Sequence, residues 1–283
     1  MRLTVSSYSF EAIPLEGTLA VAKAMGFQGV DIGGFHKRGL ASYEPDEVGA
    51  NPQKFADHLN ALLDKYELIA VDFFPQFGES PAQRSANDPD PSVRAQNIES
   101  FKGLVQFCKL TNIPGMTVLP GVDHVGYTLD QNLEGSAATM RQYVQIAGEQ
   151  GISVRYEPHM GSITDTPELA LWLCGQVPGL QITLDYTHFL LQYIPLERAH
   201  KLIPHTGHVH VRQARPGKLQ TRHAEGTLDY VEIAHRLRVG GFKGCMSLEY
   251  VCADWYDVNQ VDTLTETMLT KAVLAPHVSV YGD

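Results

Sequence analysis

The hydrophobic and polar positions of this chain follow two alternating periods along its whole length. Short runs with period two, rich in β-branched and aromatic residues, predict strands, and longer segments with helical periodicity predict helices. The predicted strands are 3–9, 29–33, 68–74, 115–119, 153–157, 181–185, 208–212 and 245–249. The predicted helices are 15–25, 52–65, 91–109, 129–149, 166–176, 196–203, 228–237 and 260–275. The pattern therefore predicts eight strand-then-helix units.

Eight such units indicate parallel strands joined by right-handed crossovers, and eight strands close into a (β/α)8 TIM barrel. We expect an α/β fold with a single domain, residues 1–283, because no linker-like stretch interrupts the pattern. An open doubly wound sheet is the alternative, but its nucleotide-binding forms carry a glycine-rich turn after the first strand. Residues 6–10, SSYSF, stand at that place, and the sequence has no phosphate-binding loop motif.

Two connections, 35–51 after the second strand and 74–90 after the third, are longer than the others. The loops at the C-terminal ends of barrel strands form the active-site face, so these two connections could cover a substrate. They could equally be ordinary surface insertions, since length alone does not decide between the two.

In the last four predicted strands the polar residues fall on one parity. Buried parallel strands usually carry apolar side chains on both faces, so this alternation is unusual. Side chains change faces with period two, and we expect the apolar set to face the helices and the polar set to face the barrel interior. The polar set is Ser153, Arg155, Glu157, Gln181, Thr183, Asp185, His208, His210, Arg212, Cys245, Ser247 and Glu249.

This parity brings Glu157, Asp185, His210 and Glu249 to the C-terminal ends of four neighbouring strands, at one side of the barrel mouth. Three carboxylates so close repel one another, and either raised pKa values or a bound cation relieves the repulsion. Carboxylates with one imidazole suit Mn²⁺, Mg²⁺ or a similar ion, whereas structural zinc favours Cys and His. Each residue alone is more often an ordinary rim residue, but four consecutive strands ending this way predict one divalent metal site.

The composition of the chain limits the kinds of partner that we expect. The net charge of −10 and a pI near 5.6 argue against nucleic acid, which attracts basic surfaces. The four cysteines show no C-x-x-C spacing and stand in apolar contexts, as is typical of free thiols in a reducing compartment. The first residues, MRLTVSSYSF, lack the apolar core of a secretory signal, and no apolar run reaches membrane-spanning length. We expect a cytoplasmic protein that acts on a small molecule, without nucleic-acid or membrane partners.

Four short motifs contain the candidate ligands and give the chain a resemblance to a known family. In order, they are Tyr156-Glu157-Pro158-His159, Leu184-Asp185-Tyr186-Thr187-His188, Gly207-His208-Val209-His210 and Ser247-Leu248-Glu249-Tyr250. With this order and spacing the chain resembles, over essentially its whole length, the xylose isomerase-like TIM barrel superfamily. The branch it resembles contains sugar isomerases, D-tagatose and D-psicose 3-epimerases and inosose dehydratases.

The resemblance implies that Glu157, Asp185, His210 and Glu249 hold one ion, Mn²⁺ by preference, with Mg²⁺ or Co²⁺ as alternatives. It also implies that the two glutamates act as general acid and base at the substrate carbon, through a metal-stabilised enediolate. His188, Arg215 and His159 are then expected to bind the substrate. The reaction implied is isomerisation or epimerisation of a sugar or keto-sugar.

Several alternatives stay open. With a leaving group on the next carbon, the same residues would give a dehydratase or lyase acting on a keto-sugar, an inosose or a 3-keto-glycoside. A non-catalytic sugar-binding barrel is a second alternative. Endonuclease IV, from the same superfamily, is a third, but the third strand ends in VDFFP without a histidine, and the acidic charge opposes DNA binding.

The segment after His210 departs from the related epimerases. Gln213 stands where they carry an acidic residue, and the segment is unusually basic, with Arg212, Arg215, Lys218, Arg222 and His223. It could meet an anionic group of the substrate, or it could be a solvated loop that contacts a second subunit of a homo-oligomer. Arg155, at inward parity, could pair with a carboxylate inside the barrel.

Overall fold

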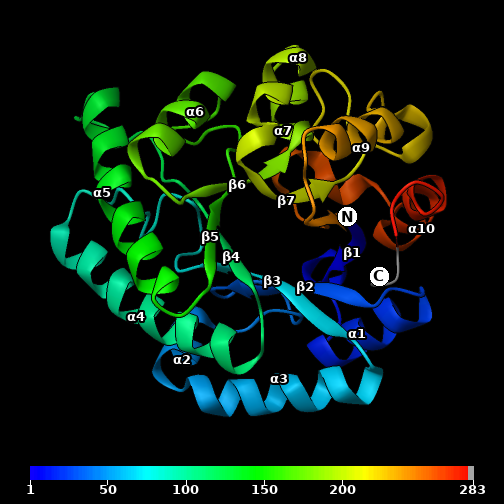
Figure 1. Cartoon of the computed structure of the whole chain (residues 1–283), viewed down its shortest axis with the longest axis horizontal. Helices are drawn as coiled ribbons and strands as arrows, with labels where there is room; N and C mark the ends of the chain where they lie inside the picture. Colours follow the sequence, from blue (N-terminus) through cyan, green and yellow to red (C-terminus); the bar gives the residue numbers. More distant parts are fainter. Residues whose placement is uncertain (280–283) are drawn as a thin grey trace.

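In the computed structural model of the chain, which describes residues 1–279, eight parallel strands close into a barrel in the order β1-β2-β3-β4-β5-β6-β7-β8. The helices form a ring around these strands (Figure 1). The strands are β1 (Arg2–Ser6), β2 (Gly29–Phe35), β3 (Ile69–Gln76), β4 (Gly115–Val118), β5 (Ser153–Tyr156), β6 (Gln181–Asp185), β7 (Thr206–Val211) and β8 (Cys245–Leu248). The prediction of a (β/α)8 TIM barrel is confirmed.

The helices follow the predicted order, with two additional short helices, at 45–50 and 186–191, that the pattern did not predict. They are α1 (Leu15–Ala24), α2 (Pro45–Ala50), α3 (Pro52–Tyr66), α4 (Pro91–Leu110), α5 (Leu129–Gly148), α6 (Pro167–Gln176), α7 (Tyr186–Leu191), α8 (Leu196–Ala199), α9 (Tyr230–Val239) and α10 (Thr263–Leu274). Short 3₁₀ helices lie at η1 (Ser7–Phe10), η2 (His200–His205), η3 (His223–Glu225) and η4 (Trp255–Gln260). In residues 1–279 no helix combines the length and apolar character needed to cross a bilayer.

Two predicted elements end three or more residues earlier than predicted. The first strand stops at Ser6, and the chain turns into η1, where the Ser7 hydroxyl accepts a hydrogen bond from the backbone N–H of Gly33 at 3.1 Å. The helix predicted over 196–203 is α-helical only to Ala199 and continues as η2. Pro204 lies in that segment, and proline cannot donate the backbone hydrogen bond that an α-helix requires.

The barrel interior is polar, as the parity of the last four strands predicts. Ile182, Leu184, Val209 and Val211 are fully buried in the hydrophobic core that the strands share with the helices. Inside the barrel, hydroxyls and ionisable groups pair between strands. The pairs are Thr117 with Thr183 at 2.6 Å, Arg155 with Asp72 at 2.6 Å and His208 with Asp31 at 2.9 Å. These three contacts each join side chains of different strands across the interior.

Candidate active site

The four predicted ligands lie at the mouth of the barrel, where the strands end. Glu157 follows β5 directly, Asp185 is the last residue of β6, His210 lies near the end of β7, and Glu249 follows β8. All four side chains are buried, with residue exposures of 0 to 6%. Burial of so many ionisable groups is costly unless they pair with one another or with a ligand.

His210 lies between the two glutamates. Its Nδ1 is 2.6 Å from Oε1 of Glu157 and 3.5 Å from Oε1 of Glu249. One ligand atom from each of these three residues lies within 4.8 Å of the others. Glu157, His210 and Glu249 therefore form one compact group with two oxygen donors and one nitrogen donor.

Asp185 belongs to a neighbouring group. Its Oδ1 accepts hydrogen bonds from the backbone N–H of Thr187 at 2.8 Å and from the Thr187 hydroxyl at 2.7 Å, so it caps the N-terminus of α7. Its Oδ2 accepts a hydrogen bond from Nη2 of Arg212 at 2.8 Å and lies 3.6 Å from Nε2 of His188. Asp185, the fourth predicted metal ligand, is thus paired with the guanidinium of Arg212.

Arg212 is a residue of this site that the sequence reasoning did not assign to it. Its residue exposure is 2%, and Nη1 lies 3.4 Å from Oε2 of Glu249. The signal was present in the sequence, because Arg212 shares the inward parity of His208 and His210.

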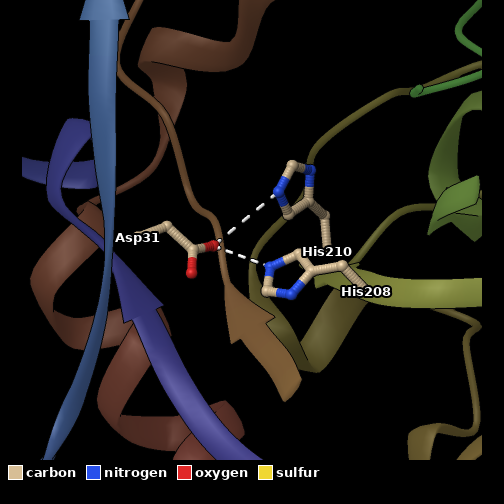
Figure 2. Close-up of side chains that lie close together, drawn as sticks. All are labelled: Asp31, His208 and His210. Carbon is tan, nitrogen blue, oxygen red and sulfur yellow. Dashed lines mark hydrogen bonds and ion pairs between the residues drawn. The ribbon is translucent and has the colours of Figure 1, made fainter. Parts of the chain in front are cut away.

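A second set of polar residues lies on the other side of His210. Figure 2 shows the Asp31 carboxylate pointing toward the imidazoles of both His208 and His210; Asp31 Oδ2 lies 2.9 Å from Nε2 of His208 and 3.8 Å from Nε2 of His210. The Tyr8 hydroxyl lies 3.2 Å from the same Nε2 of His210. The hydrogen bond between Tyr8 and this nitrogen orients the ring of His210, as the outer hydrogen-bond partner of a metal-binding histidine does.

The pKa values of the central residues move in opposite directions. Burial alone would lower the pKa of His210, but the charges of Glu249 and Glu157 outweigh it and raise that pKa to about 10. Burial raises the pKa of Glu249 to about 7, against the opposing effect of His210 and Arg212. Burial opposes the charged form of Glu157 too, but its close contact with His210 lowers its pKa overall. Two glutamates 2.6 and 3.5 Å from one imidazole nitrogen therefore differ in proton affinity.

Both glutamates line a cavity of about 760 Å³, a volume typical of small-molecule sites. Tyr8, Glu157, His188, Arg212 and Glu249 line it. The two long connections contribute to its wall, the first through Arg38 and the second through segment 79–82. Both connections thus face the cavity.

The structure brings two of the three predicted substrate-binding residues to this cavity. His159 and His188 both line it, with ring centroids 5.9 Å apart. Nε2 of His159 and Nδ1 of His188 are buried without a hydrogen-bond partner among residues 1–279, so each is available to a ligand. Burial lowers the pKa of both histidines, that of His188 to about 4.

Arg215 lies elsewhere. It is exposed, in a turn where its backbone N–H donates to the carbonyl of Lys218 at 3.2 Å, and it is not among the described residues that line the cavity. Of the five basic residues in that segment, Arg212 alone lines the cavity within the described part of the chain. The guanidinium at the cavity is therefore that of Arg212 and not that of Arg215.

The donor set fits a divalent ion in part. Glu157, His210 and Glu249 offer the oxygen and nitrogen donors that Mn²⁺ or Mg²⁺ accepts. Oε2 of Glu249 is buried and accepts no hydrogen bond within residues 1–279, although Nη1 of Arg212 lies 3.4 Å from it, so it keeps lone pairs for an ion. Buried acid and histidine clusters at the mouth can thus hold a metal through three residues, while Asp185 faces Arg212.

The sequence matches the family described as xylose isomerase-like TIM barrel over residues 19–270, and the chain belongs to this family. No curated protein sequence matches it. Among solved structures, 3-keto-D-glucoside 4-epimerase YcjR from E. coli is 16% identical, with a TM-score of 0.75 over 98% of this chain and 99% of that one. D-psicose 3-epimerase from Clostridium cellulolyticum H10 is 16% identical, with a TM-score of 0.73 over 98% and 99%. An L-ribulose 3-epimerase is 15% identical, with a TM-score of 0.74 over 97% and 93%. At these identities the likeness shows the shared barrel fold.

Proposed function

We propose that this protein is an isomerase or epimerase of a sugar or keto-sugar, and that it moves a proton at a carbon next to a carbonyl group. The observation that carries the proposal is the pair of buried glutamates, Glu157 and Glu249, which flank one imidazole nitrogen and line the cavity. Epimerisation needs one group that removes a proton and a second that returns one, and two carboxylates at one substrate carbon meet that need. The family and the epimerases that share its fold support this class of substrate.

Each residue has a role in the proposed reaction. Glu157 and Glu249 exchange protons with the substrate carbon, while His210, which Tyr8 contacts from the other ring nitrogen, links the two carboxylates through Nδ1. The unpartnered nitrogens of His159 and His188 bind substrate hydroxyls. A divalent ion on Glu157, His210 and Glu249, Mn²⁺ before Mg²⁺ or Co²⁺, would supply a Lewis acid for the substrate carbonyl. The sequence also predicted coordination by Asp185, but the contact of Asp185 with Arg212 argues against it.

Solvent exchange tests the proposal. The purified protein with Mn²⁺ is incubated in D₂O with D-tagatose, D-fructose, L-ribulose and 3-keto-glucosides, and deuterium incorporation next to the carbonyl is followed by NMR. We expect incorporation and an epimer or isomer from at least one substrate. Glu249→Gln and Glu157→Gln should each reduce the rate by about 10²–10⁴-fold with the circular dichroism unchanged. Glu225→Gln is the matched control, because Glu225 is exposed on η3.

The same experiment separates the alternatives. Loss of water or of a glycosidic leaving group, in place of an epimer, would identify a dehydratase or lyase that uses the same glutamates. Binding of sugars without exchange in any substrate, with Mn²⁺, Mg²⁺ or Co²⁺ present, would contradict the proposal and identify a sugar-binding barrel.

A further inference from the structure

Arg212 is held firmly at the metal-binding end of the barrel. It directly follows β7, and both of its backbone polar groups meet the Tyr230 hydroxyl, which lies 3.2 Å from the Arg212 nitrogen and donates to its carbonyl at 2.7 Å. Nε lies 3.3 Å from the Thr187 hydroxyl. Backbone and side chain are thus fixed by separate contacts, so the guanidinium has a defined position.

That position lies between two residues predicted to bind the ion. Nη2 donates to Oδ2 of Asp185 at 2.8 Å and lies 3.2 Å from Nε2 of His188, while Nη1 lies 3.4 Å from Oε2 of Glu249. A guanidinium is permanently charged and needs anionic partners when it is buried. Asp185 and Glu249 supply them, so the chain itself provides a cation to these two carboxylates.

Asp185 has little capacity left for an ion. Oδ1 already accepts two hydrogen bonds from Thr187, which use both of its lone pairs, and Oδ2 accepts the charged hydrogen bond of Arg212. A divalent ion on Oδ2 would lie beside the guanidinium and be repelled by it. Glu157, His210 and Glu249 form one possible ion site without Asp185. The possible site that does include Asp185, with Glu157 and His188, already has Nη2 of Arg212 at 2.8 Å from Oδ2 of Asp185 and 3.2 Å from Nε2 of His188.

We infer that Arg212 is a resident cation of this site, which keeps Asp185 out of the coordination of a divalent ion and so weakens the binding of that ion. Asp185 serves as the anchor of Arg212 and as the cap of α7, and the ion is left with Glu157, His210 and Glu249. The guanidinium lines the cavity, so its charge also faces a substrate oxygen that becomes negative. The inference concerns the site of the proposed function, but its test uses no substrate, so the two can fail separately.

The test measures Mn²⁺ binding to metal-free protein by isothermal titration calorimetry, with Mn²⁺-dependent shifts in melting temperature as a second readout. In Arg212→Met the stem is kept and the charge is lost, so Asp185 becomes free to bind the ion. We expect Mn²⁺ affinity to rise by about tenfold or more, since affinity follows the number and charge of the ligands. Arg38→Met is the matched control: Arg38 also lines the cavity, but it pairs with Glu11 at 3.2 Å, and its loss should change affinity by less than about threefold.

Asp185→Asn gives a second test that does not depend on the folding of the Arg212 variant. It keeps an oxygen to accept from Thr187 and removes the charge. We expect its Mn²⁺ affinity to fall by less than about tenfold, whereas the loss of a direct ligand should cost more than the roughly 10–100-fold that the loss of an outer partner of a ligand costs. Unchanged or weaker binding in Arg212→Met, or a large loss in Asp185→Asn, would overturn the inference.

Discussion

Nη1 of Arg155 lies 2.6 Å from Oδ1 of Asp72, and both residues are buried inside the barrel, below the site. Two glycines make room for this arginine: a Cβ at Gly115 would come within 2.6 Å of its guanidinium carbon, and one at Gly207 within 2.9 Å of its Nε. The expectation that Arg155 pairs with a carboxylate inside the barrel is confirmed. The pair joins β3 to β5 across the interior, and it leaves neither charge alone in a medium of low polarity.

Breaking this pair should destabilise the fold. Arg155→Met leaves the Asp72 carboxylate buried without its cation, and we expect the free energy of unfolding to fall by about 3–5 kcal/mol. The double variant Arg155→Met/Asp72→Asn removes both charges and should lose less than the single variant does. Urea unfolding measures both; a double variant at least as unstable as the single one would show that the cost does not come from the unpaired charge.

Glu249 should make stability depend on pH. Burial raises its pKa in the folded protein to about 7 from the usual 4.5, so the folded state holds the proton more tightly than the unfolded state does. Its contribution is fully favourable below pH 4.5 and is lost as the pH rises through 7. In EDTA, from about pH 5 to about pH 8, the wild type should lose about 2–3 kcal/mol relative to Glu249→Gln. Equal pH slopes for the two proteins in urea unfolding would contradict this.

Metal binding should be visible in thermal stability. An ion that binds the folded protein stabilises it by mass action, by about 2.7 kcal/mol at a free concentration 100 times Kd. We expect Mn²⁺ to raise the melting temperature and EDTA to lower it, and His210→Leu to abolish the response, since His210 lies between both glutamates. A melting temperature that ignores millimolar Mn²⁺ would count against a metal centre.

Substitution by alanine should have opposite effects on stability at two glycines that lie in helices. A Cβ at Gly103 in α4 would lie 1.9 Å from the carbonyl oxygen of Gly49 in α2, so Gly103→Ala must push the two helices apart. We expect a loss of about 1–3 kcal/mol, as overpacking usually costs. Gly175 in α6 has nothing within 4 Å of that position, and Gly175→Ala should be neutral or stabilising by up to about 1 kcal/mol. Chemical unfolding of both variants would detect a reversal of this order.

The fold could be predicted from the sequence because its signals are local and repeated. Eight changes between the two periods fix the number of strands, and their parity decides which side chains face inward. The convergence of Glu157, His210 and Glu249 follows from that parity and from the common direction of parallel strands. The helix α7 was missed because its residues directly follow β6, where Asp185 ends the strand and caps the helix at once.

The remaining site residues depend on tertiary contacts that spacing does not reveal. Tyr8 reaches His210 only because the chain leaves the strand pattern at Ser6 and turns into η1. Asp31 stands in an apolar strand of the first half of the chain, and its partner His208 is far away in sequence. Arg215 and Arg212 are three residues apart, and only the path of the turn after β7 decides which of them enters the cavity.

The barrel closes by pairing β1 with β8, the first and last strands along the chain. Leu3 of β1 is paired with Met246 of β8, and the Ser6 and Ser247 hydroxyls lie 3.2 Å apart. During synthesis on the ribosome, β1 therefore cannot pair with β8 until nearly 250 residues have emerged. Glu249 directly follows β8, so it is among the last residues to reach its position in the site. The proposed activity should consequently require the closed barrel, and nascent or cleaved chains that lack β8 should be inactive.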